Sequence, residues 1–335
     1  MPFCMPVKMD EFKDTQNLSH GIYMKKKLLV TGGLGFIGSY FVKLALDAGY
    51  HIINVDKKTY AARTDVDFDG HPNYEWIEAD IATMTHLPPS IDYVVNFAAE
   101  SHVDNSIHAN EAFYHSNIGG VYNLLELIRA KDETDQPLLF HISTDEVYGT
   151  CHKDAFTEED KLLPSNPYSA TKAAAEQLIF GWRHTHGIKA IICRSCNNYG
   201  FGQYPEKLLA KTIEFLLSGK KMTVHGDGTY LREWIYAKDN CEGLLTVLEK
   251  GKEGEVYNIS SGEEHSVIDA VKMVAEAMGV EEDEALVHIP NRPGQDLRYS
   301  VDCSKARALG WKPKTTLKEY LPEYIRLYKE RLGVQ

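Results

Sequence analysis

The sequence has no long apolar run and no excess of positive charge. No stretch approaches the ~18–20 consecutive apolar residues that a membrane-spanning helix requires. With 36 Lys and Arg against 48 Asp and Glu, the formal net charge is −12. Such a balance argues against a protein that binds the phosphate backbone of nucleic acids. We therefore expect no membrane partner and no nucleic-acid partner.

Cysteines are few and scattered, with six in 335 residues. Scattered cysteines are typical of the reducing cytoplasm, and we expect a cytoplasmic protein. Only Cys193 and Cys196 form a CxxC, and no second CxxC or paired histidine motif accompanies them. The surrounding IICRSCNNYG looks like a strand that runs into a loop. We expect a structural or incidental role for both thiols and no metal site.

The first 23 residues lack the apolar core of a signal peptide. They read MPFCMPVKMDEFKDTQNLSHGIY, and the Met24 that follows is a plausible start in its own right. We expect residues 1–23 to be a tag or a dispensable extension, so that the folded protein begins near residue 24.

Strand-like and helical segments alternate from residue 25 onward. Continuously apolar or alternating segments predict strands at LLVTGG, HIINVD, YEWIEADI, IDYVVNFAA, PLLFHIST and KAIICRS. Helical spacing is found at 36–48, at 112–129 and at about 168–186. This order predicts an α/β protein with a Rossmann-type, doubly wound parallel sheet.

The rhythm changes beyond residue 197, where loops rich in Gly, Pro, Asn and Tyr separate short helices. The length of the chain leaves room for more than one lobe. We expect a cofactor-binding domain with the catalytic residues at 24–196. We expect 197–335 to form mainly a smaller α/β substrate-binding lobe, with some segments returning to the first domain.

A glycine-rich stretch, TGGLGFIGS, follows the first predicted strand and opens the first predicted helix. It fits GxGxxG at 33–38, a turn in which backbone N–H groups and a helix N-terminus bind a pyrophosphate. Asp56 ends the second strand, 18 residues after Gly38, where a carboxylate binds ribose hydroxyls and repels a 2′-phosphate. The pattern predicts NAD rather than NADP, although Lys57 and Lys58 would offset a phosphate charge.

Tyr168 and Lys172 in NPYSATKAAAEQL lie four residues apart, on one face of a predicted helix. A lysine beside a phenol favours the phenolate and lowers its pKa, so that the oxygen can accept a hydroxyl proton. Ser143 and Thr144 end a strand about 24 residues upstream. The combination is typical of alcohol oxidation by hydride transfer in the extended short-chain dehydrogenase/reductase superfamily.

Two adjacent carboxylates, Asp145 and Glu146, follow the same strand in HISTDEVYG. The carboxyl ends of strands in a doubly wound sheet face the ligand, so we expect both side chains in the cleft. Alcohol oxidation needs neither of them, whereas an acid and a base suit elimination of water beside a carbonyl. Capping of the next segment or pairing with Lys or Arg is the alternative role.

From Met24 to the C-terminal helix, the sequence resembles the dTDP-glucose 4,6-dehydratases among the sugar-nucleotide-modifying short-chain dehydrogenases. The resemblance rests on many matches in the same order along the chain. The matching stretches are TGGLGFIGS, DKKTYA, NFAAESHVDNSI, HISTDEVYG, NPYSATKAAAEQL, RSCNNYG, QYPEKLL, GDGTYLREWIYAKD, EVYNIS and RPGQDLRYSVD.

The resemblance implies dehydration of a nucleotide sugar, with NAD regenerated in every cycle and dTDP-glucose as the expected substrate. Tyr168, supported by Lys172 and Thr144, would accept the C4 hydroxyl proton during oxidation. Glu146 would then abstract the C5 proton, and Asp145 would protonate the departing C6 hydroxyl. The product would be a 4-keto-6-deoxy sugar.

The resemblance also implies two sets of binding residues and a homodimer formed by helices near 112–130 and 168–186. The expected NAD-binding residues are Gly32, Gly35, Phe36, Ile37, Gly38, Asp56, Lys57, Asp80, Ile81, Ala98, Ala99, Tyr168 and Lys172. The expected residues for the nucleotide sugar are Ser101, Asn117, Asn197, Lys207, Arg232, Asn258, Arg292 and Tyr299.

Several positions depart from the family pattern, among them Asn105, Cys196, Phe201 and Gln295. UDP-glucose or UDP-N-acetylglucosamine as substrate, and a 5,6-ene as product, therefore stay open. Among other reactions, a 4-epimerase needs no Asp–Glu pair, and related decarboxylases typically carry Ser where Asp145 stands. A non-catalytic, cofactor-sensing protein would be expected to lack Tyr168 or Lys172.

Overall fold

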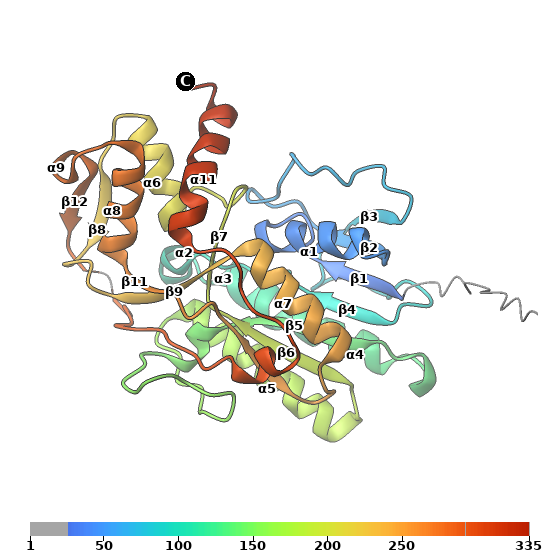
Figure 1. Cartoon of the computed structure of the whole chain (residues 1–335). Coiled ribbons are helices and arrows are strands. Elements are labelled where there is room, and N and C mark those ends of the chain that lie inside the picture. The colour runs from blue at the N-terminus through green and yellow to red at the C-terminus, as the bar shows by residue number, and fades with distance from the viewer. Residues whose placement is uncertain (1–25, 292, 335) are drawn as a thin grey trace, which may run out of the picture.

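The structure, a computed structural model, describes residues 26–291 and 293–334 (Figure 1). The expectation for residues 1–23 and the expected contact by Arg292 lie outside these residues. Among the described helices, none is both long and apolar enough to cross a membrane.

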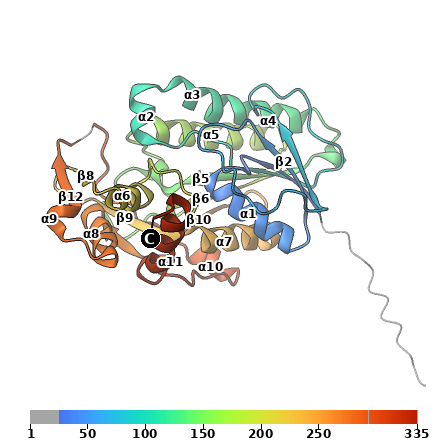
Figure 2. The same cartoon turned by 90° about the horizontal axis from the view of Figure 1, so that it is seen from above.

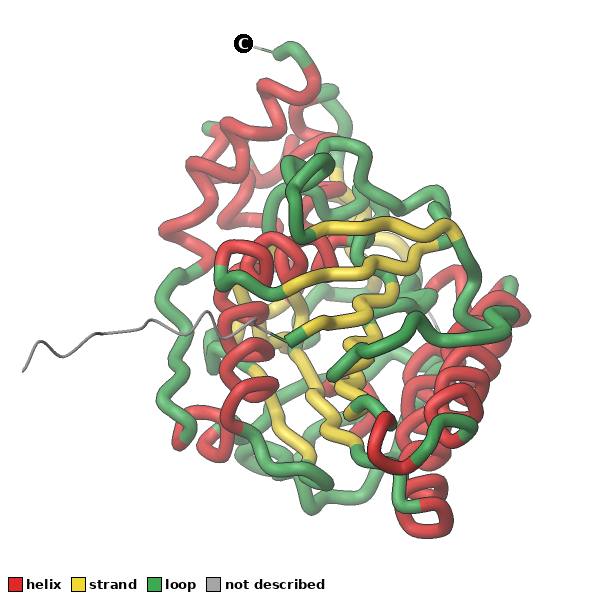
Figure 3. The backbone as a smooth tube through the Cα atoms, turned by 90° about the vertical axis from the view of Figure 1, so that its right-hand side faces the viewer, coloured by secondary structure: helices red, strands yellow, loops and turns green. Residues whose placement is uncertain are grey.

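Seven parallel strands form the central sheet in the order β10-β6-β5-β4-β1-β2-β3 (Figure 3). The chain winds outward in both directions from β1, which pairs with both β2 and β4. The predicted doubly wound sheet is confirmed, and its switch point lies beyond the ends of β1 and β4. The strands are β1 Lys27–Thr31, β2 His51–Asp56, β3 Tyr74–Glu78, β4 Tyr93–Asn96, β5 Leu138–Thr144, β6 Ala190–Ser195 and β10 Val256–Ile259.

Helices cover both faces of the sheet, as Figure 2 shows from above. α1 Phe36–Asp47 and α7 Ala237–Lys250 lie on one face, and α4 Gly120–Arg129 and α5 Pro167–His186 lie on the other. Leu28 of β1 packs on the α1 side and Leu29 on the α4 side, both completely buried. Burial on both faces explains why the strands are apolar without alternation.

A smaller lobe, on the left of Figure 1, carries two small sheets and the C-terminal helix. The sheet β11-β9-β7 and the pair β12-β8 hold Asn197–Tyr199 (β7), Met222–His225 (β8), Leu231–Tyr236 (β9), Glu264–Ser266 (β11) and Leu286–Ile289 (β12). The lobe's helices are α6 Leu208–Leu217, α8 Val267–Met278, α9 Glu282–Ala285 and α11 Leu317–Leu332. Tyr199, Tyr324 and Tyr328 are completely buried in its core.

Several segments beyond residue 197 pack with the first domain, among them α7 and β10. α7 lies against α1, and β10 extends the large sheet by pairing with β6. The remaining elements are short helices and turns. They are α2 Val103–His108, α3 Glu111–Phe113, a π-helical turn at Tyr114–Gly119, 3₁₀ turns at Glu133–Asp135 and Asp145–Tyr148, and α10 Ser304–Ala308.

Candidate active site

The turn between β1 and α1 depends on glycine at two positions. Gly32 has a φ of +72°, and a Cβ there would lie 2.7 Å from the backbone nitrogen of Ala98. A Cβ on Gly38 would lie 2.2 Å from the carbonyl oxygen of Gly32. This glycine turn therefore brings backbone N–H groups without covering side chains, and the N-terminus of α1, to the switch point, as a pyrophosphate requires.

Asp56 ends β2 with its carboxylate held by two backbone N–H groups, those of Leu34 at 3.0 Å and Lys58 at 2.9 Å. Each carboxylate oxygen keeps a lone pair for a ribose hydroxyl. Lys57 is engaged by Ser116 at 2.9 Å and by Asp80 at 3.4 Å, and the Lys58 ammonium lies 3.6 Å from the centre of the Trp76 ring. Since other groups engage both lysines, the site favours a free 2′-hydroxyl over a 2′-phosphate.

A cavity of about 300 Å³ lies along this edge of the sheet. It runs from the glycine turn past Asp56 to the catalytic turn after β5. Every residue expected to bind NAD lines it. They are Gly32, Gly35, Phe36, Ile37, Gly38, Asp56, Lys57, Asp80, Ile81, Ala98, Ala99, Tyr168 and Lys172.

The first two turns of α5 present Tyr168 and Lys172 to this cavity. Asn166 caps the helix with a hydrogen bond from the Ser169 N–H at 2.9 Å, and Pro167 occupies the first turn. Lys172 is 4% exposed, and its Nζ donates to the carbonyl oxygen of Ile142 at 2.7 Å. Burial lowers the pKa of Lys172 to about 8, and Glu176 opposes that shift.

The pKa of Tyr168 differs from the sequence-based expectation. Burial, and next the charge of Glu146, raise it above its ordinary value, while a hydrogen bond with Thr144 lowers it. Lys172 does not produce the expected lowering in this structure. The physical reason is burial, because the phenol is only 8% exposed and its anion loses hydration.

A row of polar side chains lies behind Lys172 across three adjacent strands. Thr31, Asn96 and His141 are paired in register on β1, β4 and β5. The Thr31 hydroxyl donates to Asn96 Oδ1 at 2.6 Å, Asn96 Nδ2 lies 3.0 Å from His141 Nδ1, and Lys172 Nζ lies 3.5 Å from His141 Nε2. Burial, and then Lys172, hold the pKa of His141 well below its ordinary value, so this imidazole is neutral.

Thr144, Asp145 and Glu146 form the turn at the end of β5. Thr144 Oγ1 donates to Asp145 Oδ1 at 3.3 Å and accepts the Glu146 N–H at 3.3 Å. Asp145 is 2% exposed, and its Oδ2 has no hydrogen-bond partner among the described residues. Burial, and next Glu146, raise the pKa of Asp145 well above its ordinary value. Both effects favour the protonated carboxylic acid at Asp145. Contrary to the expectation, Asp145 lines neither cavity, whereas Glu146 lines both.

A second cavity, of about 210 Å³, opens toward the smaller lobe. It meets the first at the catalytic turn, because both cavities are lined by Glu146, Asn197, Asn198, Gln203, Glu206 and Lys207. Arg232 and Tyr299, expected to bind the nucleotide sugar, line it as well. Lys207 donates to the carbonyl oxygen of Ser101 at 2.6 Å, and Ser101 lines the first cavity.

Tyr299 links the smaller lobe to the catalytic turn. Its hydroxyl lies 2.6 Å from Asp296 Oδ2 and 3.3 Å from Glu146 Oε2. The Arg232 guanidinium lies 4.1 Å from the centre of the Tyr299 ring and donates to the carbonyl oxygen of Asp296 at 2.9 Å. Asp296 thus anchors two residues of the second cavity.

The side chain of Asn258, expected to bind the substrate, is buried and forms its hydrogen bonds within the protein. The residue is completely buried on β10, and its Oδ1 accepts a hydrogen bond from the Tyr148 hydroxyl at 2.9 Å. Its Nδ2 donates to the carbonyl oxygens of Phe156 and Asp302. Because both amide protons are used and neither cavity reaches it, the expectation is corrected: Asn258 supports the turn after β5.

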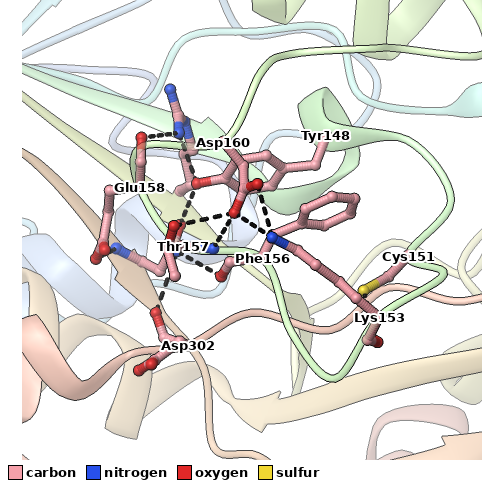
Figure 4. A network of polar contacts seen from close by, with 10 residues as sticks. Tyr148, Cys151, Lys153, Phe156, Thr157, Glu158, Asp160 and Asp302 are labelled. Carbon is pink, nitrogen blue, oxygen red and sulfur yellow. Dashed lines mark hydrogen bonds and ion pairs between the residues drawn. The ribbon is translucent and has the colours of Figure 1, made fainter.

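That support continues through residues 151–160, as Figure 4 shows. The Tyr148 ring stacks on Phe156 with centres 4.9 Å apart. Asp160 accepts hydrogen bonds from Lys153 and Thr157, which close the loop on itself (Figure 4). The segment therefore packs against the catalytic turn and supports it.

Asn117 also has a structural role. Its side chain accepts from the Glu100 N–H at 2.9 Å and donates to the Glu100 carbonyl oxygen at 3.0 Å and to Thr171 Oγ1 at 2.9 Å. It is 1% exposed and lines neither cavity. Asn117 fixes the loop after β4 to α5, and the expected substrate contact is corrected in the same way.

Comparison with known proteins identifies the family. The family model described as GDP-mannose 4,6 dehydratase matches residues 29–324. The chain belongs to this family of nucleotide-sugar 4,6-dehydratases. The suspected resemblance is confirmed, and both cysteines of the CxxC are buried and form no disulfide.

Relatives of this dehydratase are similar over nearly the whole chain. Low-salt glycan biosynthesis protein Agl12 of Haloferax volcanii is 44% identical over 307 residues, covering 90% of this chain and 98% of the relative. The dTDP-glucose 4,6-dehydratase of Escherichia coli is 38% identical, covering 90% of this chain and 93% of the relative.

One solved structure is also similar over nearly the whole chain. DesIV, a dTDP-glucose 4,6-dehydratase from Streptomyces venezuelae crystallised with NAD, superposes with a TM-score of 0.85 at 35% identity, covering 92% of this chain and 98% of that one. The predicted NAD dependence is confirmed, and the residues of the first cavity fit that cofactor.

Sequence reasoning missed part of the dehydratase's second cavity. Its far wall is lined by His225, Tyr230, Trp234 and Val267, which come from β8, β9, α8 and the loop between the two strands. The matching stretch GDGTYLREWIYAKD contains two of them and was the available signal. His225 and Val267 carry no motif, since only the packing of the lobe brings them together.

Proposed function

We propose that the chain converts an NDP-hexose, with dTDP-glucose as the first choice, to the NDP-4-keto-6-deoxyhexose. One observation carries the proposal. The oxidation residues, Thr144 on the turn after β5 and Tyr168 on α5, lie beside an acid and a base of the same turn, Asp145 and Glu146, near the junction of the two cavities. An epimerase needs the first pair alone, whereas water loss needs both pairs.

Oxidation at C4 begins the proposed reaction. The residues of the first cavity would hold NAD, which would supply the acceptor for the C4 hydride and its return to C6. As the phenolate, Tyr168 accepts the C4 hydroxyl proton, and Thr144 lies beside the phenol oxygen. The burial of both side chains excludes water from the reacting atoms.

Elimination follows because the 4-ketone acidifies the C5 hydrogen. Glu146 lines both cavities and takes that proton. Asp145, whose raised pKa favours the protonated form, gives its proton to the departing C6 hydroxyl. Each positioned proton transfer contributes about 10²–10⁴-fold to the rate.

The nucleotide diphosphate is assigned to the second cavity, where cations from the smaller lobe gather. Arg232 suits a bidentate contact with a phosphate, and Lys207 a point-charge contact. Asn197 lines the junction and Ser101 lines the first cavity, on the side where the hexose would lie. Tyr299 joins this clamp to the catalytic turn.

The test is a panel of nucleotide sugars. Purified protein is incubated separately with dTDP-glucose, UDP-glucose and UDP-N-acetylglucosamine, and products are followed by mass spectrometry and by the alkaline absorbance of a 4-keto sugar. Loss of one water from dTDP-glucose without net NADH is expected. No water loss from any of the three overturns the proposal, and a preference for a UDP sugar overturns only the choice of nucleotide.

We also propose a homodimer through α4 and α5. Tyr114 and Tyr122 near and on α4 are 65% and 49% exposed, and Tyr122 packs edge-on against Trp182 of α5. An aromatic patch of this kind is typical of a protein interface. Light scattering after size-exclusion chromatography should give twice the chain mass, and Tyr122→Glu should give the chain mass. A monomeric parent protein contradicts the proposal.

A further inference from the structure

The loop between β2 and β3, residues 57–73, contains no helix or strand and runs beside the first cavity (drawn in blue above α1 in Figure 1). Thr59, Ala61 and Ala62 of this loop line that cavity. Connections of this length inside a compact domain are uncommon and are usually functional. The contacts that hold the loop therefore bear on how the cofactor enters and leaves.

Another part of the cavity wall comes from the smaller lobe, and Tyr60 joins the two parts. Gln203, Tyr204 and Glu206 line the cavity from the segment between β7 and α6. The Tyr60 ring meets the Tyr204 ring edge-on with centres 5.0 Å apart, and the Tyr60 hydroxyl donates to Glu206 Oε2 at 3.0 Å. Tyr60 is 54% exposed and does not itself line the cavity, so this contact lies on the outer side.

Arg63 attaches the same loop at a second place. Its backbone N–H donates to the carbonyl oxygen of Leu34 in the glycine turn at 2.7 Å, and its guanidinium donates to Ser39 Oγ of α1 at 3.2 Å. The guanidinium also lies directly against Gly202, where a Cβ would be 2.6 Å from Arg63 Cζ. The loop is therefore bound to the glycine turn and to the smaller lobe at once.

We propose that Tyr60 is a cofactor-retaining residue. Its contact with Tyr204 and Glu206 closes the loop over bound NAD, and this contact must break before the cofactor can leave. The two attachments differ in burial, because the Arg63 side chain is 14% exposed and Tyr60 more than half exposed. The Tyr60 contact is therefore the one that opens, as loops that gate an active site do.

The proposed reaction, on which the purpose of this contact rests, requires retention of the cofactor. The hydride taken from C4 must return to C6 of the same sugar. Cofactor released between these two steps would leave the sugar oxidised at C4 and the protein without the hydride that completes the turnover. A dehydrogenase that exchanges its cofactor in every cycle has no such requirement.

The test measures cofactor release directly. Protein loaded with NADH is mixed rapidly with an excess of NAD, and the loss of bound NADH fluorescence gives the dissociation rate. Tyr60→Phe keeps the ring against Tyr204 but removes the hydroxyl, and it should speed dissociation about tenfold, equivalent to about 1.4 kcal/mol. Tyr60→Ala also removes the aromatic pair and should release NADH faster still.

Glu206→Ala completes a double-mutant cycle. Because it removes the other partner of the same hydrogen bond, it should add little to the dissociation rate of Tyr60→Phe. Tyr93→Phe is the matched control. The Tyr93 hydroxyl also bonds to a charged group, the Lys26 ammonium at 2.7 Å, but it lies at the first residue of β4, at the edge of the sheet opposite the cavity. This variant should release NADH at the parent rate.

Two results would overturn the proposal. One is an unchanged dissociation rate in Tyr60→Phe, and the other is a pair of effects, from Tyr60→Phe and Glu206→Ala, that simply add. These measurements use no nucleotide sugar, so their outcome is separate from that of the substrate panel. If the unaltered protein removes no water from any nucleotide sugar, it is the proposed function that fails.

Discussion

Lys172 Nζ lies 3.5 Å from His141 Nε2, at the end of the polar row that crosses β1, β4 and β5. Asn96 Nδ2 can only donate to His141 Nδ1, so the neutral imidazole carries its proton on Nε2, facing Lys172. His141→Leu removes this N–H group and should raise the pKa of Lys172, because the neutral amine loses a hydrogen-bond donor. The basic limb of the pH profile for C4 oxidation should shift to higher pH. His141→Gln retains an N–H donor and should stay near the parent profile; identical shifts in both variants would rule out this role.

Lys172 should also mark the pH dependence of folding. Its pKa is about 8 when folded, against about 10.4 in an unfolded chain. Between these values the unfolded state binds the extra proton, so the free energy of unfolding rises with pH, by at most about 1.4 kcal/mol per unit. Lys172→Met removes this slope. Urea titrations from pH 8 to 10 should therefore show the parent gaining stability on the variant, and a constant difference would contradict the assignment.

The buried pair Arg194–Glu176 should dominate stability near the site. Arg194 Nη2 lies 2.6 Å from Glu176 Oε2, the two side chains are 3% and 0% exposed, and Ser143 also donates to Glu176. Glu176→Gln leaves a buried guanidinium without its counter-charge and should cost about 3–5 kcal/mol in urea unfolding. Glu323→Gln, at the exposed pair with Arg326, is the control and should change nothing measurable. Equal effects at the two sites would disprove the prediction.

The glycine turn should be intolerant of a single methyl group. Gly38→Ala would place its Cβ 2.2 Å from the Gly32 carbonyl oxygen, so the backbone that binds the pyrophosphate must shift. Calorimetric titration with NAD should show affinity reduced by about tenfold or more, given ~1–3 kcal/mol for overpacking. Gly181→Ala in α5 meets nothing within 4 Å and should leave NAD affinity unchanged. Unaltered NAD binding by Gly38→Ala would mean that the glycine turn does not hold the cofactor.

Local pattern predicts much of this fold because each strand of the large sheet is buried on both faces. Leu28 and Leu29 each reach a different helical layer, which leaves an unbroken apolar run in the sequence. The glycine turn and the Tyr168–Lys172 pair were also readable, since fixed spacing on a turn or helix determines which groups share a face. These features depend on neighbours close in the chain.

Features that depend on tertiary packing could not be predicted from the sequence. Asn258 stands in a family-like motif, yet its side chain turns inward to Tyr148 because β10 joins the large sheet beside β6. The polar row through Asn96 and His141 exists only through the strand register. Burial of Tyr168 reverses the pKa shift that proximity to Lys172 suggested, because desolvation outweighs a nearby charge. In each case the deciding neighbour lies far away in the sequence.

The most direct test of the central claim follows the hydrogen on C4. dTDP-glucose carrying deuterium at C4 is incubated with the protein, and the product is analysed by mass spectrometry and proton NMR. The account predicts loss of one unlabelled water, a ketone at C4, and the deuterium in the new methyl group at C6. Deuterium retained at C4 of an epimer, or its complete loss to solvent, would contradict dehydration by internal hydride transfer.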